Sequence, residues 1–138
     1  MKKNILPFLI NISICLILAS IFSSCEDYVY KDIEGQWKLT EKYVSGGEIE
    51  KVDTVFYSFK KNVFKFLSKT NTDDVNNIHC FGNYTKEGNI LNIELIESTF
   101  RNGVPDWDNL KRTYTIKSYS KSNLILEYKD TTYIFVKY

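Results

Sequence analysis

Residues 78–96 read IHCFGNYTKEGNILNIELI, and this stretch decides the fold. In its second half, Leu91, Ile93 and Leu95 alternate with polar residues, which is the period of a half-buried strand. The tetrapeptide KEGN at 86–89 is typical of a hairpin turn, because Gly and Asn tolerate the backbone angles that tight turns need. The stretch therefore predicts two antiparallel strands.

Short alternating segments of this kind recur on both sides of the hairpin, and no long segment has helical spacing. Eight antiparallel strands with mostly short turns favour closure, since a closed barrel leaves no strand edges exposed. The predicted fold is all-β, an eight-stranded antiparallel up-and-down barrel, and the same pattern also permits a two-sheet β-sandwich. The expected strands are Ile33–Val44, Thr54–Phe59, Val63–Ser68, Ile78–Thr85, Ile90–Ile96, Leu110–Ser118, Leu124–Lys129 and Thr132–Tyr138.

Composition limits the class of protein. The 138 residues include 15% aromatics but only 6 Gly and 2 Pro, which excludes collagen-like chains and argues against disorder. The formal net charge is +1, and it falls to −1 if Lys2 and Lys3 are removed with a leader. A near-neutral domain gives no electrostatic reason to expect nucleic-acid binding.

The N-terminus has the layout of a secretory signal peptide: two lysines, a mainly apolar run at 5–22, then small residues before Cys25. Cys25 after Ser-Ser resembles the lipobox of bacterial lipoproteins. That resemblance implies a lipid anchor on Cys25 and location at the cell envelope, in the outer membrane, with the periplasmic or surface side left open. An uncleaved membrane helix is the alternative, disfavoured by Pro7 and Asn11 within the run. The expected divisions are 1–24 signal peptide, 25–32 lipidated tether and 33–138 barrel domain.

The tripeptide Gly35-Gln36-Trp37 opens the first expected strand. It resembles the Gly-x-Trp signature of lipocalins, and residues 33–138 look like the small lipocalin-like domains of Bacteroidota lipoproteins. The resemblance implies that Gly35 lets the chain cross the barrel floor and that Trp37 closes that end, with a plain core position as the alternative for Trp37. The family's basic residue that packs on this Trp would be Lys137. The family's Thr-Asp-Tyr turn has no counterpart in this sequence.

Alternating apolar side chains would supply the barrel interior, where they either line a cavity for a small apolar or amphipathic ligand or fill a core. So many aromatics in a short barrel favour a largely filled interior. The side chains expected to face inward are Phe64, Phe66, Leu91, Ile93, Leu95, Leu124, Leu126, Tyr128, Tyr133 and Phe135.

The longest loop, 97–109, contains Phe100, Arg101 and Trp107. Trp107 is expected to tuck over the barrel mouth as a lid, with an exposed contact for a ligand or partner as the alternative. Asp53-Thr54 and Asp130-Thr131 resemble O-glycosylation acceptors of Bacteroidota, which makes Thr54 and Thr131 candidate modification sites.

No metal, cofactor or catalytic site is expected. His79 is the only His and neighbours Cys80, but adjacent strand residues point to opposite faces and cannot chelate one ion. Asp73-Asp74 is expected to be a solvated turn rather than a calcium site. Without a nucleophile or phosphate motif, an enzyme is not expected.

Two functional hypotheses remain. The first is a membrane-tethered barrel that binds a small apolar or amphipathic ligand. The second is a protein-interaction or inhibitor module of the cell envelope, with a filled barrel core and loops around Trp107 presented to a partner.

Overall fold

The computed structural model describes residues 33–69, 77–99, 104 and 106–138. Within these ranges the backbone forms nine strands and one short 3₁₀ helix, and every paired strand is antiparallel to its neighbour. The elements are β1 (Gly35–Val44), β2 (Glu50–Lys51), β3 (Val55–Lys60), β4 (Val63–Ser68), β5 (Ile78–Glu87), β6 (Ile90–Leu95), η2 (Glu97–Thr99), β7 (Lys111–Tyr119), β8 (Asn123–Tyr128) and β9 (Thr131–Lys137).

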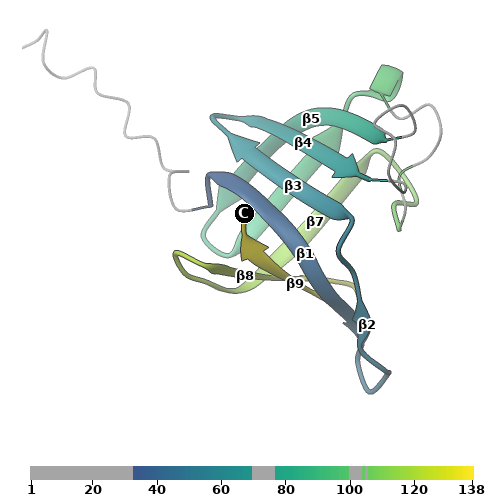
Figure 1. Cartoon of the computed structure of the whole chain (residues 1–138). Helices are drawn as coiled ribbons and strands as arrows, with labels where there is room; N and C mark the ends of the chain where they lie inside the picture. Colours follow the sequence, from purple (N-terminus) through teal and green to yellow (C-terminus); the bar gives the residue numbers. More distant parts are fainter. Residues whose placement is uncertain (1–32, 70–76, 100–103, 105) are drawn as a thin grey trace, which may run out of the picture.

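The sheet closes on itself into a barrel (Figure 1). From β3 to β9 each strand pairs with the next along the chain, while β1 pairs with both β3 and β9. The closing register runs from Trp37↔Lys137 to Val44↔Thr131. The two residues of β2 lie beside β1 and take no part in closure. The predicted eight-stranded up-and-down barrel is confirmed, and the alternative sandwich is excluded.

The strands lie where the alternation predicted them, with small differences at their ends. β1 begins at Gly35, whose φ of 123° lies in a region that favours glycine. β5 continues to Glu87, so that a two-residue turn with Gly88 at φ 59° leads into β6. β2 was not predicted, because its two residues are exposed and carry no alternation.

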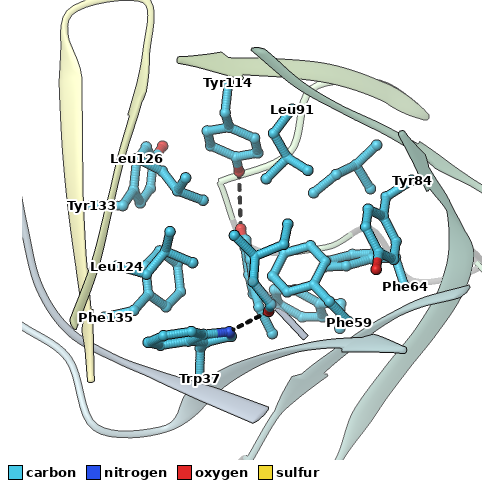
Figure 2. Packing of buried hydrophobic residues seen from close by; sticks show 14 of the residues in the cluster. Trp37, Phe59, Phe64, Tyr84, Leu91, Tyr114, Leu124, Leu126, Tyr133 and Phe135 are labelled. Atoms are coloured by element: carbon cyan, nitrogen blue, oxygen red, sulfur yellow. Dashed lines mark hydrogen bonds between the residues drawn. The ribbon is translucent and has the colours of Figure 1, made fainter. Parts of the chain in front are cut away.

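Aromatic and aliphatic side chains pack together in the barrel interior (Figure 2). The ring of Tyr57 from β3 lies within 6.5 Å, centroid to centroid, of five other rings contributed by β3, β4, β7 and β9. Each such pair adds roughly 0.5–1.5 kcal/mol beyond the burial of its area. Of the side chains expected to face inward, Tyr128 is half-buried and the others are buried: Phe64, Phe66, Leu91, Ile93, Leu95, Leu124, Leu126, Tyr133 and Phe135.

Trp37 lies fully buried at the end of the barrel where β1 begins. Its Nε1 donates a hydrogen bond to the carbonyl of Ile33 at 2.8 Å. The Nζ of Lys137 lies 4.2 Å from the centroid of the Trp37 ring and donates to the carbonyl of Glu34. Burial lowers the pKa of Lys137. Lys137 therefore occupies the place of the basic residue that packs on the signature Trp, and this end of the barrel is closed.

Candidate ligand-binding site

A hollow of about 510 Å³ lies at the opposite end, which we call the mouth. The end of β1, the residues leading into and forming β2, the chain before β7, and the β8–β9 turn contribute to its lining. Tyr43, Trp107, Tyr128 and Tyr133 supply aromatic surface, and much of the remaining lining is charged. A hollow of this size and mixed character suits a small organic molecule.

A β-bulge in β1 directs Lys42 towards the mouth. Leu39 pairs with Phe135 but Glu41 pairs with Ile134, so one extra residue interrupts the register and reverses the faces beyond it. The Nζ of Lys42 then lies 2.8 Å from Oδ2 of Asp106 and 3.2 Å from Oε2 of Glu50. Burial opposes the charge on Lys42, but the hydrogen bonds and charges of these carboxylates outweigh it and raise its pKa.

Residues 106–108 cross the mouth, and we call them the strap. Asp106 has a positive φ of 67°, and Trp107 donates its backbone N–H to the carbonyl of Val104 at 2.9 Å. At the other end of the strap, Lys129 donates to Oδ2 of Asp108 at 3.0 Å. That hydrogen bond lowers the pKa of Asp108 and raises the pKa of Lys129. A lysine from β1 and a lysine from the β8–β9 turn thus hold the strap.

Trp107 points down into the barrel and is only 7% exposed. Its Nε1 donates to the hydroxyl of Tyr57 at 3.2 Å, and its ring stacks on Phe64 at 6.2 Å. The expected tucked position is therefore the one found, and the alternative of an exposed contact does not apply to this side chain.

Arg112 lies beneath the strap, with its side chain 1% exposed. Its guanidinium carbon lies 4.6 Å from the ring centroid of Trp107 and 4.3 Å from that of Tyr128. Nη1 donates to the hydroxyl of Tyr114 at 3.2 Å, and Nη2 donates to the carbonyl of Asp106. Nε is buried and has no hydrogen-bond partner among the described residues.

The tyrosine hydroxyls next to Arg112 form a buried chain. The hydroxyls of Tyr57 and Tyr114 lie 3.0 Å apart. Figure 2 labels Tyr114 and marks the hydrogen bond at its hydroxyl with a dashed line. Burial raises the pKa of Tyr57 and raises that of Tyr114 well above 10.0; for Tyr114, the neighbouring Tyr57 adds to the shift. Both phenols are therefore neutral at physiological pH.

The other predicted site residues are distributed over the molecule. Gly35 and Trp37 lie at the closed end, Thr54 is half-buried just before β3, and Thr131 is half-buried at the start of β9, where it lines the mouth. Cys25, Phe100, Arg101 and the Asp73-Asp74 pair lie outside the described residues.

His79 and Cys80 occupy opposite faces of β5, as the alternation predicts: His79 is exposed and Cys80 is buried. The Sγ of Cys80 donates to the carbonyl of Thr99 at 3.0 Å, and burial raises the pKa of its thiol. Across the described ranges, no group of three or more His, Cys, Asp or Glu side chains is placed to hold a metal ion. The same part of the chain has no helix of sufficient length and apolar character to cross a bilayer.

Sequence reasoning did not identify Lys42, Arg112 or Lys129 as site residues. For Arg112 a signal existed, because Arg112, Tyr114 and Ile116 alternate in an expected strand and must share the inward face. Lys42 carried no such signal, because strict alternation from Trp37 would have placed Glu41 inside.

Known proteins with similar sequences or structures agree with the observed fold. Residues 20–138 match the family described as a lipocalin-like domain. The crystal structure of a lipocalin-like protein from Bacteroides uniformis is 33% identical, with a TM-score of 0.70, and the match covers 78% of this chain and 99% of that one. An uncharacterized protein from Bacteroides eggerthii is 24% identical, with a TM-score of 0.68 and coverage of 78% and 100%, and shows the shared fold alone. No curated protein matches. Since the family match spans most of the sequence, the chain belongs to the lipocalin-like domain family.

Proposed function

We propose that this chain is a lipid-anchored lipoprotein of the outer membrane that binds a small amphipathic molecule at the barrel mouth. The observation that supports this function is the hollow of about 510 Å³, in which aromatic side chains lie beside charged ones. Because rings fill the barrel around Tyr57, the ligand would bind beneath and beside the strap rather than deep in the interior. Aromatic surface would accept its apolar part, and the charged lining its polar end.

The second hypothesis, an interaction module that presents Trp107 to a partner, has less support. Trp107 is buried under its own strap, bonded to Tyr57 and packed on Arg112. A side chain held in this way offers no exposed anchor for a protein interface.

Ligand binding at the mouth can be tested by placing a larger side chain in the hollow. Val44, the last residue of β1, lines the hollow, whereas Ile49 in the connection that follows does not; both side chains are exposed. In the protein purified from cells that express the full chain, Val44→Trp should weaken binding of the amphipathic fluorophore 1-anilinonaphthalene-8-sulfonate by about tenfold, or about 1.4 kcal/mol. Ile49→Trp is the matched control and should bind like the original protein. Equal binding by both variants would contradict a site at the mouth.

The lipid anchor has a separate test. Several buried acyl chains hold a soluble domain stably on a bilayer, at about 0.8 kcal/mol per methylene. Cells fed an alkyne analogue of palmitate should label the full chain and the variant Cys80→Ala, but not Cys25→Ala. Labelling of Cys25→Ala would contradict the anchor. Intact-mass analysis of the same preparation also tests glycosylation at Thr54 and Thr131, which should appear as mass beyond the lipid.

A further inference from the structure

Arg112 is a buried cation without a dedicated counter-ion. Its guanidinium is always protonated in proteins, and a buried charge is normally paired. Among the described residues, however, the nearest carboxylate oxygen belongs to Asp108 and lies 3.8 Å from Nη2. Asp108 is 51% exposed and already bonds Lys129 at 3.0 Å. It is therefore a poor partner for a charge whose side chain is 1% exposed.

The remaining neighbours of Arg112 do not supply a negative charge either. The carboxylate of Asp106 is turned to Lys42, so that only the main-chain carbonyl of Asp106 accepts from Nη2. The raised pKa values of Tyr57, Tyr114 and Tyr133, caused chiefly by burial, keep all three phenols neutral. The guanidinium thus has one charged neighbour at the edge of hydrogen-bonding range and one donor, Nε, with no acceptor.

We propose that Arg112 binds the carboxylate of an anionic amphipathic ligand, an inference that rests on the mouth-binding function above. The planar guanidinium is held between the rings of Trp107 and Tyr128, which fixes its orientation. A carboxylate can accept two parallel N–H bonds from an arginine, and the unpartnered Nε offers one of them. The ligand carboxylate would replace Asp108 as the counter-ion of Arg112. The aromatic lining of the mouth would then accept the apolar chain.

The test uses three probes that share one chain and differ in the polar end: decanoate, decan-1-ol and decylammonium. Calorimetric titration of the protein from cells expressing the full chain should give decanoate an affinity at least about tenfold above the other two, as expected for a desolvated charged pair. Arg112→Met should bring decanoate down to the level of decan-1-ol. Lys111→Met removes an exposed cation beside Arg112 in β7 that does not line the mouth, and it should keep the preference for decanoate.

Asp108→Asn gives an independent readout on an exposed residue. Removing the competing carboxylate should tighten decanoate binding by about threefold or more and leave decan-1-ol unchanged, whereas a purely structural role of Arg112 predicts no such selectivity. Equal binding of decanoate and decan-1-ol to the original protein would overturn the role of Arg112 while the mouth-binding function stands. A preference for decanoate that persists in Arg112→Met would likewise overturn the role of Arg112 and leave the mouth-binding function standing. Failure of all three probes and of the fluorophore would overturn both proposals.

Discussion

At the level of single residues, we expect Arg112 to lower the stability of the ligand-free protein. Replacing buried ionic groups by apolar side chains of similar size is often neutral or stabilising by about 1–4 kcal/mol. We therefore expect Arg112→Met to leave the free energy of unfolding unchanged or to raise it by up to about 2 kcal/mol. Tyr114→Phe is the contrast: it should cost about 1–2 kcal/mol, because it removes a partner from both Arg112 and Tyr57. Urea unfolding measures both. A larger loss in Arg112→Met than in Tyr114→Phe would contradict a poorly paired cation.

Gly35 carries the second residue-scale prediction. Its φ of 123° lies in the left-handed region, and an added Cβ would clash with Nζ of Lys137, which would have to leave the Trp37 ring. Gly35→Ala should lower the free energy of unfolding by about 1–3 kcal/mol. The control is Gly88→Asn in the β5–β6 turn, where φ is 59°, nothing lies within 4 Å of an added Cβ, and Asn tolerates this conformation. Equal losses in urea unfolding would refute a special role for Gly35.

The sequence predicted the positions of side chains well where the buried residue is apolar, and poorly where the buried residue is charged. Leu91, Ile93 and Leu95 are apolar and inward, so alternation was sufficient to place them. Arg112 has the same alternation but a charge that is usually at the surface, and the ordinary rule for charged residues hid it. Its environment depends on Trp107 and Tyr128, which come from other parts of the chain.

At the element scale, the strap depends on ion pairs that respond to pH. The hydrogen bond from Lys129 holds the pKa of Asp108 below its usual 3.8. A lowered carboxylate pKa gives stability that is present above 3.8 and is lost as pH falls through the folded-state value. We expect the strap to stay closed between about pH 5 and 9 and to loosen in acid below 3.8, with Trp107 becoming accessible to acrylamide. Trp37, fully buried at the far end, gives a constant background.

The variant Lys129→Met provides the control for this acid response. Without Lys129 the strap lacks this hydrogen bond at every pH, so acrylamide quenching of Trp107 should already be higher at pH 7 and should rise less in acid. Unchanged quenching at pH 7 together with an unchanged rise in acid would show that the pair of Asp108 and Lys129 does not hold the strap. Exposed ion pairs contribute little to stability, so the global stability of the variant should change little.

The elements that could not be predicted from the sequence are those whose residues show no periodic alternation of apolar and polar side chains. The strands were predicted because side chains alternate along them, but the bulge that turns Lys42 inward adds a single residue and leaves no mark in composition. β2 pairs through two exposed residues, and the strap is fixed by partners on β1, β7 and the β8–β9 turn. Local patterns cannot specify contacts made between such distant segments.

At the scale of the whole molecule, closure joins the two ends of the domain. Trp37 pairs with Lys137, and the backbone N–H of Tyr138 donates to the carbonyl of Gln36 at 2.9 Å. Closure was predicted from the cost of exposed strand edges and not from a local motif. An open meander would leave its two outermost strands unpaired along one side. Pairing across about a hundred residues is expected to form slowly and late, since the entropy of closing so long a loop must be offset first.

The barrel should therefore be one cooperative unit in which the closing strand is indispensable. Ile134 in β9 pairs with Ile125 on one side and with Glu41 on the other, so proline there would remove a backbone donor and distort a strand with two neighbours. Ile134→Pro should abolish the folded state, seen as loss of the cooperative unfolding transition. Lys51→Pro, in the two-residue strand beside β1, should lower the free energy of unfolding by no more than about 1 kcal/mol, because it breaks at most one edge pairing. If Ile134→Pro kept a cooperative transition and the buried signal of Trp37, β1 and β9 would not be what holds the barrel closed.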